Sequence, residues 1–217
     1  MPGPDLTHGP HLIYFADPMC SWCYGFAPVI DAITRRFGAD LPIRLVLGGL
    51  RPGTTAAMDA ATRAAIRVHW QHVQEASGQP FDHAFFDRPE FIYDTEPACR
   101  AVVVLRRHGM AAALAALHAV QSAFYAANRD VTQAATLAEI AAAQGVPAAA
   151  FLADFAAPAA QEETRRDFAF SQGAGVTGFP TLLAGTGAGD AYAMVTEGFR
   201  PADRLLPALE RWRAALG

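Results

Sequence analysis

Hydrophobic patterning predicts a strand, a helix and a second strand at the start of the chain. Residues 11–16, HLIYFA, form a short apolar run typical of a buried strand. Apolar positions then recur at helical spacing from Trp22 to Phe37, and Gly38 supplies a stop. Residues 43–50, IRLVLGGL, form a second apolar run that ends in glycines. A strand, helix and strand within about 40 residues predict a βαβ unit with parallel strands.

The pattern becomes helical in the middle of the chain and returns to strands at its end. The alanine-rich stretch from about Thr55 to Phe170 predicts about six helices, one of them with Asp94 or Thr95 as its N-cap. Residues 181–187 and 191–199 flank a glycine-rich turn near 187–190, which predicts a hairpin. Residues 200–216 predict a closing amphipathic helix.

This order of elements predicts an α/β fold with a helical excursion. If the helix at about 158–174 belongs to the sheet, residues 1–55 and 158–217 form one domain of βαβ and ββα units. The helices of residues 56–157 are then an insertion domain between its two parts.

Composition and charge exclude several classes of partner. The chain of 217 residues is 52% hydrophobic and has a net charge of -4 without a run of basic residues, so nucleic acid is not expected as a partner. It shows neither a signal peptide nor an apolar stretch of about 18 residues, so we expect a soluble, cytoplasmic protein without a membrane partner. Three cysteines are too few for a disulfide framework, which also fits a reducing compartment.

Cys20 and Cys23 form a CxxC pair at the junction between the first strand and its helix. Unpaired N–H groups and the positive end of the helix dipole favour an anion at such a junction, and a thiolate is such an anion. Cys20 is therefore predicted to be a nucleophile, and Cys23, one helical turn further on, can close a disulfide with it. Exchange would run through a mixed disulfide on Cys20 that Cys23 resolves.

A metal site and two inert core cysteines are the competing interpretations of this pair. Structural zinc needs four ligands, and no second CxxC exists. His69 and His72 lie one helical turn apart, but a solvated helix face explains them without a metal. No metal ligand is predicted, and the inert interpretation is less favoured because a helix start after a strand is a typical position for function.

A second segment supports redox chemistry. Residues 175–183, GVTGFPTLL, place Pro180 directly before a strand, where it donates nothing to the ladder. A CxxC at a strand-to-helix junction, a helical insertion and GVTGFPT before a hairpin and last helix together resemble the DsbA family. The closer likeness is to its FrnE-type dithiol-disulfide isomerases, which share the residues that look like Asp17, Tyr24 and Thr95 here.

The resemblance implies a thioredoxin fold with a large all-helical insertion, and it implies roles for the site residues. Pro180 would be a cis-proline beside the CxxC, Cys20 the attacking thiol and Cys23 the resolving thiol. The backbone of Phe179 would pair with an extended substrate segment. Trp22 would lie at the exposed rim as part of an apolar contact surface.

The chain departs from DsbA between its two cysteines. DsbA has a His in this dipeptide that helps to hold the thiolate, whereas this chain has Ser21 and Trp22. A less stabilised thiolate makes a weaker oxidant, so we predict a reduction potential below that of DsbA. We count Ser21 and Trp22, with Phe179, as candidate substrate-binding residues.

The leading functional hypothesis is a thiol-disulfide oxidoreductase or isomerase acting on a disulfide-containing protein or a small-molecule thiol. No cofactor is expected, with glutathione as a candidate co-substrate. Two alternatives are a glutathione-dependent transferase or isomerase of the kappa or hydroxychromene-carboxylate isomerase type, and a chaperone-like binding module. For Cys99 a buried structural role is preferred over a redox role. The direction of exchange, the electron donor and the oligomeric state are left open.

Overall fold

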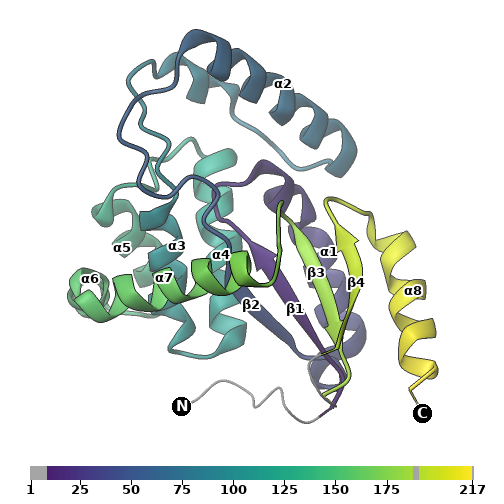
Figure 1. Ribbon diagram of the computed structural model, residues 1–217. Coiled ribbons are helices and arrows are strands. Elements are labelled where there is room, and N and C mark those ends of the chain that lie inside the picture. Colours follow the sequence, from purple (N-terminus) through teal and green to yellow (C-terminus); the bar gives the residue numbers. More distant parts are fainter. Residues whose placement is uncertain (1–8, 188–190, 217) are drawn as a thin grey trace.

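A computed structural model describes residues 9–187 and 191–216 and places four strands in one sheet (Figure 1). The strands are β1 (His11–Ala16), β2 (Ile43–Leu47), β3 (Thr181–Gly185) and β4 (Tyr192–Glu197). Their order in the sheet is β2-β1-β3-β4, so the two ends of the chain meet in its middle. β1 pairs in parallel with β2 and antiparallel with β3, and β3 pairs antiparallel with β4. The predicted βαβ unit and hairpin are therefore confirmed.

Two details of the predicted strands are corrected or stay outside the described chain. β2 ends at Leu47 rather than at residue 50, because Gly49 has a φ of +68°. That φ lies in the left-handed region, which an extended strand does not use. The predicted hairpin turn falls partly on residues 188–190, which lie outside the described residues.

Helices account for most of the rest of the described chain. The α-helices are α1 (Ser21–Phe37), α2 (Ala60–Ser77), α3 (Glu96–Arg106), α4 (Met110–Tyr125), α5 (Ala134–Ala143), α6 (Ala148–Ala156), α7 (Pro158–Gly173) and α8 (Ala202–Ala214). The short 3-10 helices are η1 (Gly38–Asp40) and η2 (His83–Asp87). The six α-helices described between β2 and β3 agree with the number predicted for the middle of the chain. Thr95 is the N-cap residue of α3, but its side chain does not cap the helix. Asp94 Oδ1 instead accepts the N–H of Glu96 at 3.0 Å.

β1 is buried on both faces, and its alternating side chains join two separate cores. Leu12, Tyr14 and Ala16 belong to the large core that the sheet shares with α1 and the helices between β2 and β3. Ile13 and Phe15 point to the opposite face and pack with Val46 of β2. A strand buried on both faces has no polar alternation, which is why its sequence appears as one continuous apolar run.

The helical region packs directly on the helix that carries the cysteines. In Figure 1, α2 crosses the end of the molecule where α1 begins. Gly25 of α1 permits this approach, because a Cβ at this position would meet Val73 Cγ1 of α2 at 2.8 Å. Trp70 of α2 lies within a cluster of aromatic rings that includes Phe85 and Tyr125. The CxxC segment is therefore supported by the helices between β2 and β3 as well as by the sheet.

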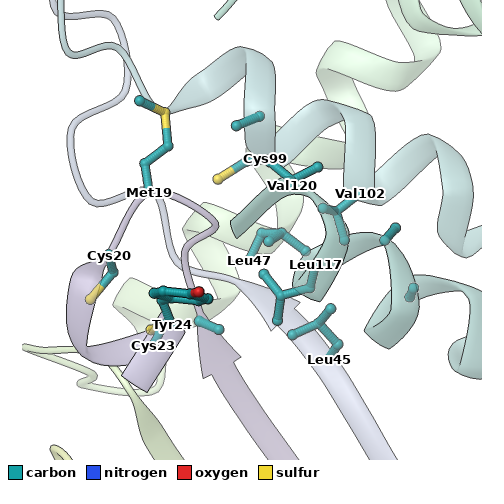
Figure 2. Packing of buried hydrophobic residues seen from close by; sticks show 14 of the residues in the cluster. Met19, Cys20, Cys23, Tyr24, Leu45, Leu47, Cys99, Val102, Leu117 and Val120 are labelled. Carbon is teal, nitrogen blue, oxygen red and sulfur yellow. The ribbon is translucent and has the colours of Figure 1, made fainter. Parts of the chain in front are cut away.

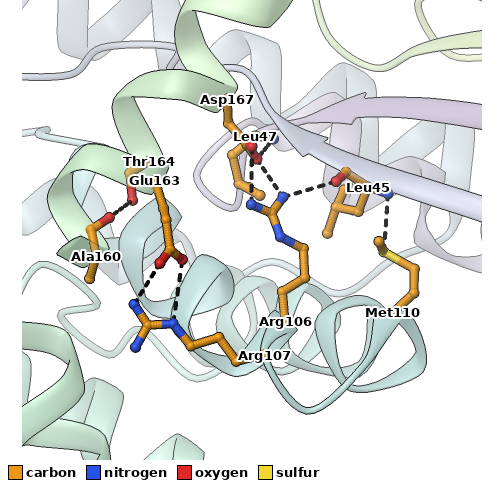
Figure 3. Close-up of polar contacts among 9 residues, drawn as sticks. All are labelled: Leu45, Leu47, Arg106, Arg107, Met110, Ala160, Glu163, Thr164 and Asp167. Carbon is orange, nitrogen blue, oxygen red and sulfur yellow. Dashed lines mark hydrogen bonds and ion pairs between the residues drawn. The ribbon is translucent and has the colours of Figure 1, made fainter. Parts of the chain in front are cut away.

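An ion pair ties two helices to β2, an edge strand of the sheet (Figure 3). Arg106 of α3 forms a bidentate pair with Asp167 of α7, at 2.6 and 3.0 Å. The same carboxylate accepts the N–H of Leu47 at 2.9 Å, and Arg106 also donates to the carbonyl oxygen of Leu45. The division of the chain into a sheet domain and an insertion domain stays a prediction. Among the helices that the structure describes, none combines the length and the apolar character needed to cross a bilayer.

Candidate active site

Cys20 occupies the N-cap of α1, immediately after the loop that leaves β1. Its carbonyl oxygen accepts the N–H of Tyr24, which starts the helix, and its own N–H donates to the carbonyl oxygen of Asp17 at 3.1 Å. The first turn of α1 carries no acidic residue. The free N–H groups and the dipole of this turn therefore favour a negative charge on the Cys20 sulfur, with no carboxylate of the turn opposing it.

The Cys20 thiol meets the segment before β3, although 159 residues separate the two in the sequence. Its Sγ lies 3.5 Å from the carbonyl oxygen of Phe179, to which the thiol donates. The Phe179–Pro180 peptide bond is cis. The structure thus brings together three of the predicted site residues, Cys20, Phe179 and Pro180, in one place.

Phe179 fits against the chain that leaves β2, and a glycine makes this contact possible. An ideal Cβ on Gly48 would lie 1.9 Å from the Phe179 ring. The Gly48 N–H also donates to the carbonyl oxygen of Ala16 at 2.8 Å, which holds the glycine beside the end of β1. Sequence reasoning missed Gly48, because only the packing of these two distant segments makes a missing side chain necessary.

Cys23 lies behind Cys20 and has no solvent exposure, whereas Cys20 is 6% exposed (Figure 2). Both thiols are free. Burial, followed by interaction with the Cys20 thiol, raises the pKa of Cys23 well above its usual value. The two thiols therefore differ chemically, because only Cys20 has any access to a substrate. Cys23 stays protonated unless a base takes its proton or a hydrogen-bond donor stabilises its thiolate.

The dipeptide between the cysteines is less exposed than predicted. Ser21 and Trp22 are both half-buried. The Trp22 ring packs against Phe199, with 5.7 Å between the ring centroids. Trp22 therefore does not stand out at an exposed rim, because the loop after β4 brings Phe199 onto it; a partly covered apolar surface remains beside Cys20.

Asp17 is a fully buried carboxylate between the two cysteines of the CxxC and Cys99. It accepts the N–H groups of Met19 at 2.8 Å and of Leu50 at 2.6 Å, and the Cys99 thiol donates to it at 3.4 Å. Burial raises the pKa of Asp17, while these hydrogen bonds act in the opposite direction. The family likeness pointed to an acidic residue here, but its contacts with residues 33 and 82 positions away could not be found from the sequence.

Two tyrosines from the region between β2 and β3 hold the loop before Cys20. The Tyr93 hydroxyl donates to the carbonyl oxygen of Met19 at 2.6 Å and lies 3.3 Å from the Tyr125 hydroxyl. The Tyr125 ring stacks on Tyr24, which follows Cys23 directly. Burial raises the pKa of both Tyr93 and Tyr125, so their hydroxyls remain protonated donors at neutral pH. No sequence motif marked Tyr93 or Tyr125.

The remaining candidates for metal or thiol chemistry lie on two helices, His69 and His72 on α2 and Cys99 on α3. His69 and His72 are exposed on α2. In the described part of the chain, no three side chains of the His, Cys, Asp and Glu types gather as metal ligands would. Cys99 is completely buried, with its pKa raised by burial and then by the charge of Asp17.

Comparison with known proteins places this geometry in a family. The model of the DSBA-like thioredoxin domain matches residues 11–209. The chain belongs to this family. A candidate protein disulfide isomerase from Nitrosomonas europaea is 37% identical, with 97% of this chain and 100% of that chain covered and a TM-score of 0.88. The cytosolic disulfide reductase DsbM from Pseudomonas aeruginosa, solved with glutathione, is 26% identical, with 95% of this chain and 96% of that chain covered and a TM-score of 0.69.

A curated relative and a second solved structure extend the comparison. The ClpXP adapter protein SpxH of Bacillus subtilis is 22% identical over 169 residues, which are 77% of this chain and 56% of that protein. The chain thus spans little more than half the length of this relative. A 2-hydroxychromene-2-carboxylate isomerase is 17% identical, with 95% of this chain and 99% of that chain covered and a TM-score of 0.67, and shows the fold alone. The predicted family and the α/β thioredoxin fold are confirmed.

Proposed function

We propose that this protein is a thiol-disulfide oxidoreductase that exchanges disulfides through Cys20 and Cys23. The observation that carries the proposal is the position of the Cys20 thiol at the N-terminus of α1, 3.5 Å from the carbonyl oxygen of Phe179 and backed by the buried Cys23. The Cys20 thiolate attacks a sulfur of the substrate disulfide, forms a mixed disulfide and releases one substrate thiolate. Cys23 then attacks the Cys20 sulfur, and the Cys20–Cys23 disulfide forms as the second thiolate leaves.

Phe179 and Pro180 supply the other wall of the site in this proposal. An extended substrate segment beside the cis bond pairs with the backbone of Phe179, in the manner of strand addition. Ser21 and the half-buried Trp22 contact the groups next to the disulfide. The substrates we propose are disulfides of proteins or of small thiols, in the cytoplasm, and the glutathione bound to DsbM supports glutathione as the small-molecule partner.

The alternative of a glutathione-dependent transferase or isomerase rests on likeness of fold alone, and no contact at the site favours it. The chaperone-like alternative predicts a function that does not need the thiols. Both can be separated from disulfide exchange by variants of the cysteines, because only exchange needs a nucleophile at position 20 and a resolving thiol at position 23.

The test compares wild type with Cys20→Ser, Cys23→Ser and the matched control Cys99→Ala. Reduction of insulin by glutathione and refolding of a scrambled disulfide protein are measured for each. We expect Cys20→Ser to abolish both activities, Cys23→Ser to accumulate a mixed disulfide with the substrate, and Cys99→Ala to retain activity. Full exchange activity in Cys20→Ser would refute the proposal, and retention of glutathione conjugation in that variant would assign the transferase function instead.

The couple is further proposed to be a weaker oxidant than DsbA, because Ser21 and Trp22 bring no charge to the thiolate. Equilibration of the Cys20–Cys23 pair with glutathione buffers measures its reduction potential. A value as oxidising as that of DsbA, about -120 mV, would contradict this part of the proposal.

A further inference from the structure

Among the described side chains with buried polar atoms that lack hydrogen bonds, Tyr14 and Gln121 lie beside the same small cavity. The hydroxyl of Tyr14 and both amide atoms of Gln121 have no partner of ordinary hydrogen-bond geometry. Tyr14 is 1% exposed and Gln121 has no exposure. Leaving such groups unpaired costs about 1–3 kcal/mol each, so native proteins normally supply a partner, often an internal water.

Both side chains line one small cavity between α1 and α4. Asp31 of α1 and His118 of α4, both exposed, stand at its mouth, and the rest of its wall is apolar. The space open to the centre of a water molecule is about 20 Å³. One water needs about 10–15 Å³ by this measure and two or more polar partners, and this cavity offers both.

Tyr14 connects this cavity to the cysteine pair. It lies on the face of β1 that packs on α1, where its ring meets the Phe26 ring, with 5.9 Å between the centroids, less than one helical turn after Cys23. After burial, the charge of Cys23 also contributes to raising the pKa of Tyr14. The phenol therefore stays protonated at neutral pH and can only donate to a thiolate. The other groups that interact with the Cys23 charge are Cys20 and Asp17, which oppose it when ionised, and the backbone N–H of Asp17, which stabilises it.

We propose that Gln121 and Tyr14 bind an ordered water in this cavity, and that the Tyr14 hydroxyl, so oriented, donates a hydrogen bond to the Cys23 thiolate. This inference rests on the proposed function, since it concerns the step in which Cys23 resolves the mixed disulfide. In that step Cys23 loses its proton to water and its sulfur forms a bond to Cys20 Sγ. The bond between Cys20 Sγ and the substrate sulfur breaks, and the substrate leaves as a thiolate with the bonding pair. Tyr14 stabilises the charge that Cys23 carries before the attack, and Gln121 is a positioning residue.

The reaction with 5,5′-dithiobis(2-nitrobenzoate) separates the two steps, because each releases one coloured thionitrobenzoate. Attack by reduced Cys20 gives the first, fast release, and attack by Cys23 on the resulting mixed disulfide gives the second. Cys23→Ser identifies the first phase, since it cannot give the second. Both phases are followed by stopped flow from pH 5 to pH 10.

Two variants test the proposal and one controls for buried hydroxyl loss. Tyr14→Phe keeps the ring and removes the donor, and Gln121→Leu keeps the volume and removes the water ligand. Thr164→Val removes a buried hydroxyl of α7 that donates to the carbonyl oxygen of Ala160, far from the cavity in the sequence and on another helix. Denaturation by urea establishes that each variant is folded at the start of the reaction.

The expected result is a change in the second phase alone. Loss of a hydrogen bond to a charged sulfur slows it about tenfold at pH 7 in Tyr14→Phe and moves its pH midpoint up by about one unit. Loss of the neutral water contact slows it about threefold in Gln121→Leu. The inference is overturned if both variants keep the wild-type second phase and its pH profile, or if Thr164→Val slows that phase equally. A wild-type protein without a second release overturns the proposed function itself.

Discussion

Asp167 accepts the backbone N–H of Leu47, the last residue of β2, and Asp17 accepts that of Leu50, three residues further on. Asp167 shares its charge with Arg106 in a bidentate pair. Asp17 is buried more deeply, and among the described residues no cation pairs with it. Its partners are two backbone N–H groups, the Cys99 thiol and the Thr95 hydroxyl.

The difference gives the two carboxylates different roles: Asp167 has a structural role, whereas the charge of Asp17 acts on the thiols of the active site. A carboxylate paired with Arg is satisfied whatever happens at the cysteines, whereas a carboxylate held by neutral donors has no opposite charge to offset the cost of burying its own. Asp17 also interacts with Cys23, Cys99 and Tyr93, whose pKa values are raised first by burial and in addition by this charge. We expect Asp167 to govern stability and Asp17 to link stability to protonation.

The largest effect is expected for Asp167→Ala. The variant leaves the Arg106 guanidinium and the Leu47 N–H without their acceptor in a largely buried place. Breaking a buried pair costs about 3–5 kcal/mol; since both partners keep some exposure here, we expect about 3 kcal/mol in urea denaturation. The rate of Cys20 alkylation by iodoacetamide should not change.

The matched control for this prediction is Arg107→Ala. Arg107, directly after α3, pairs at the surface with Glu163 of α7 and Asp154 of α6, and surface ion pairs contribute less than about 1 kcal/mol. If Asp167→Ala costs no more than Arg107→Ala, the ion pair is not the tie that the geometry indicates.

Gly48→Ala perturbs the segment between the two anchored N–H groups. The added Cβ would lie 1.9 Å from the Phe179 ring, so the ring and its backbone must move. Overpacking of this kind costs about 1–3 kcal/mol, and we expect about 2. Because the carbonyl oxygen of Phe179 is the partner of Cys20, exchange with insulin should also slow about tenfold.

Gly173→Ala serves as the control for Gly48→Ala, because a Cβ at Gly173 meets nothing within 4 Å and its φ is not left-handed. Its stability should stay within about 0.5 kcal/mol of wild type. Equal behaviour of the two alanine variants would show that the contact between Gly48 and Phe179 does not constrain the site.

The sheet and its helices could be predicted because each element carries a local signal. β1 and β2 are continuous apolar runs, α1 has helical spacing and a glycine stop, and the hairpin strands are set apart by glycines. The end of β2 was placed too far along the chain, because apolar character alone cannot show that Gly49 has a left-handed φ. It also cannot show that Gly48 leaves room for the Phe179 ring, which comes from a segment far along the sequence.

Within the site, Cys20 and Cys23 were found by their spacing, and Pro180 and Phe179 by their place before a strand together with the family likeness. Tyr14 and Gln121 carry no motif: each appears in the sequence as one residue of a buried element. Their missing hydrogen bonds become visible only when β1, α1 and α4 are packed. The half-buried state of Trp22 has the same origin, since it depends on Phe199 from the loop after β4.

Asp17→Asn tests the link between this carboxylate and protonation. Burial raises the pKa of Asp17 in the folded protein above its unfolded value of about 3.9, so the folded state binds this proton more tightly. The stability that the proton contributes is fully present below the unfolded pKa and is lost as pH rises through the folded pKa. Relative to Asp17→Asn, wild type should therefore lose stability as pH rises above about 4, and the difference should level off once Asp17 is ionised.

Urea denaturation of both proteins from pH 4 to pH 8 measures this difference, and groups that titrate alike in the two proteins cancel. If wild type instead gains stability relative to Asp17→Asn as pH rises, the hydrogen bonds of Asp17 outweigh the cost of its burial.

Cys99→Ala is expected to have the smallest effect. It removes one weak donor to Asp17, at 3.4 Å, together with a single buried sulfur, so we expect a loss of about 1 kcal/mol in urea denaturation. Insulin reduction should remain within about twofold of wild type, since Cys99 donates to the carboxylate and is shielded from substrate. Cys99→Ser, which keeps a donor, should preserve the pH dependence that Asp17 gives to the wild type. A loss of activity comparable with that of Cys20→Ser would assign Cys99 to the exchange chemistry. Asp17 would then position a third reactive thiol beside Cys20 and Cys23.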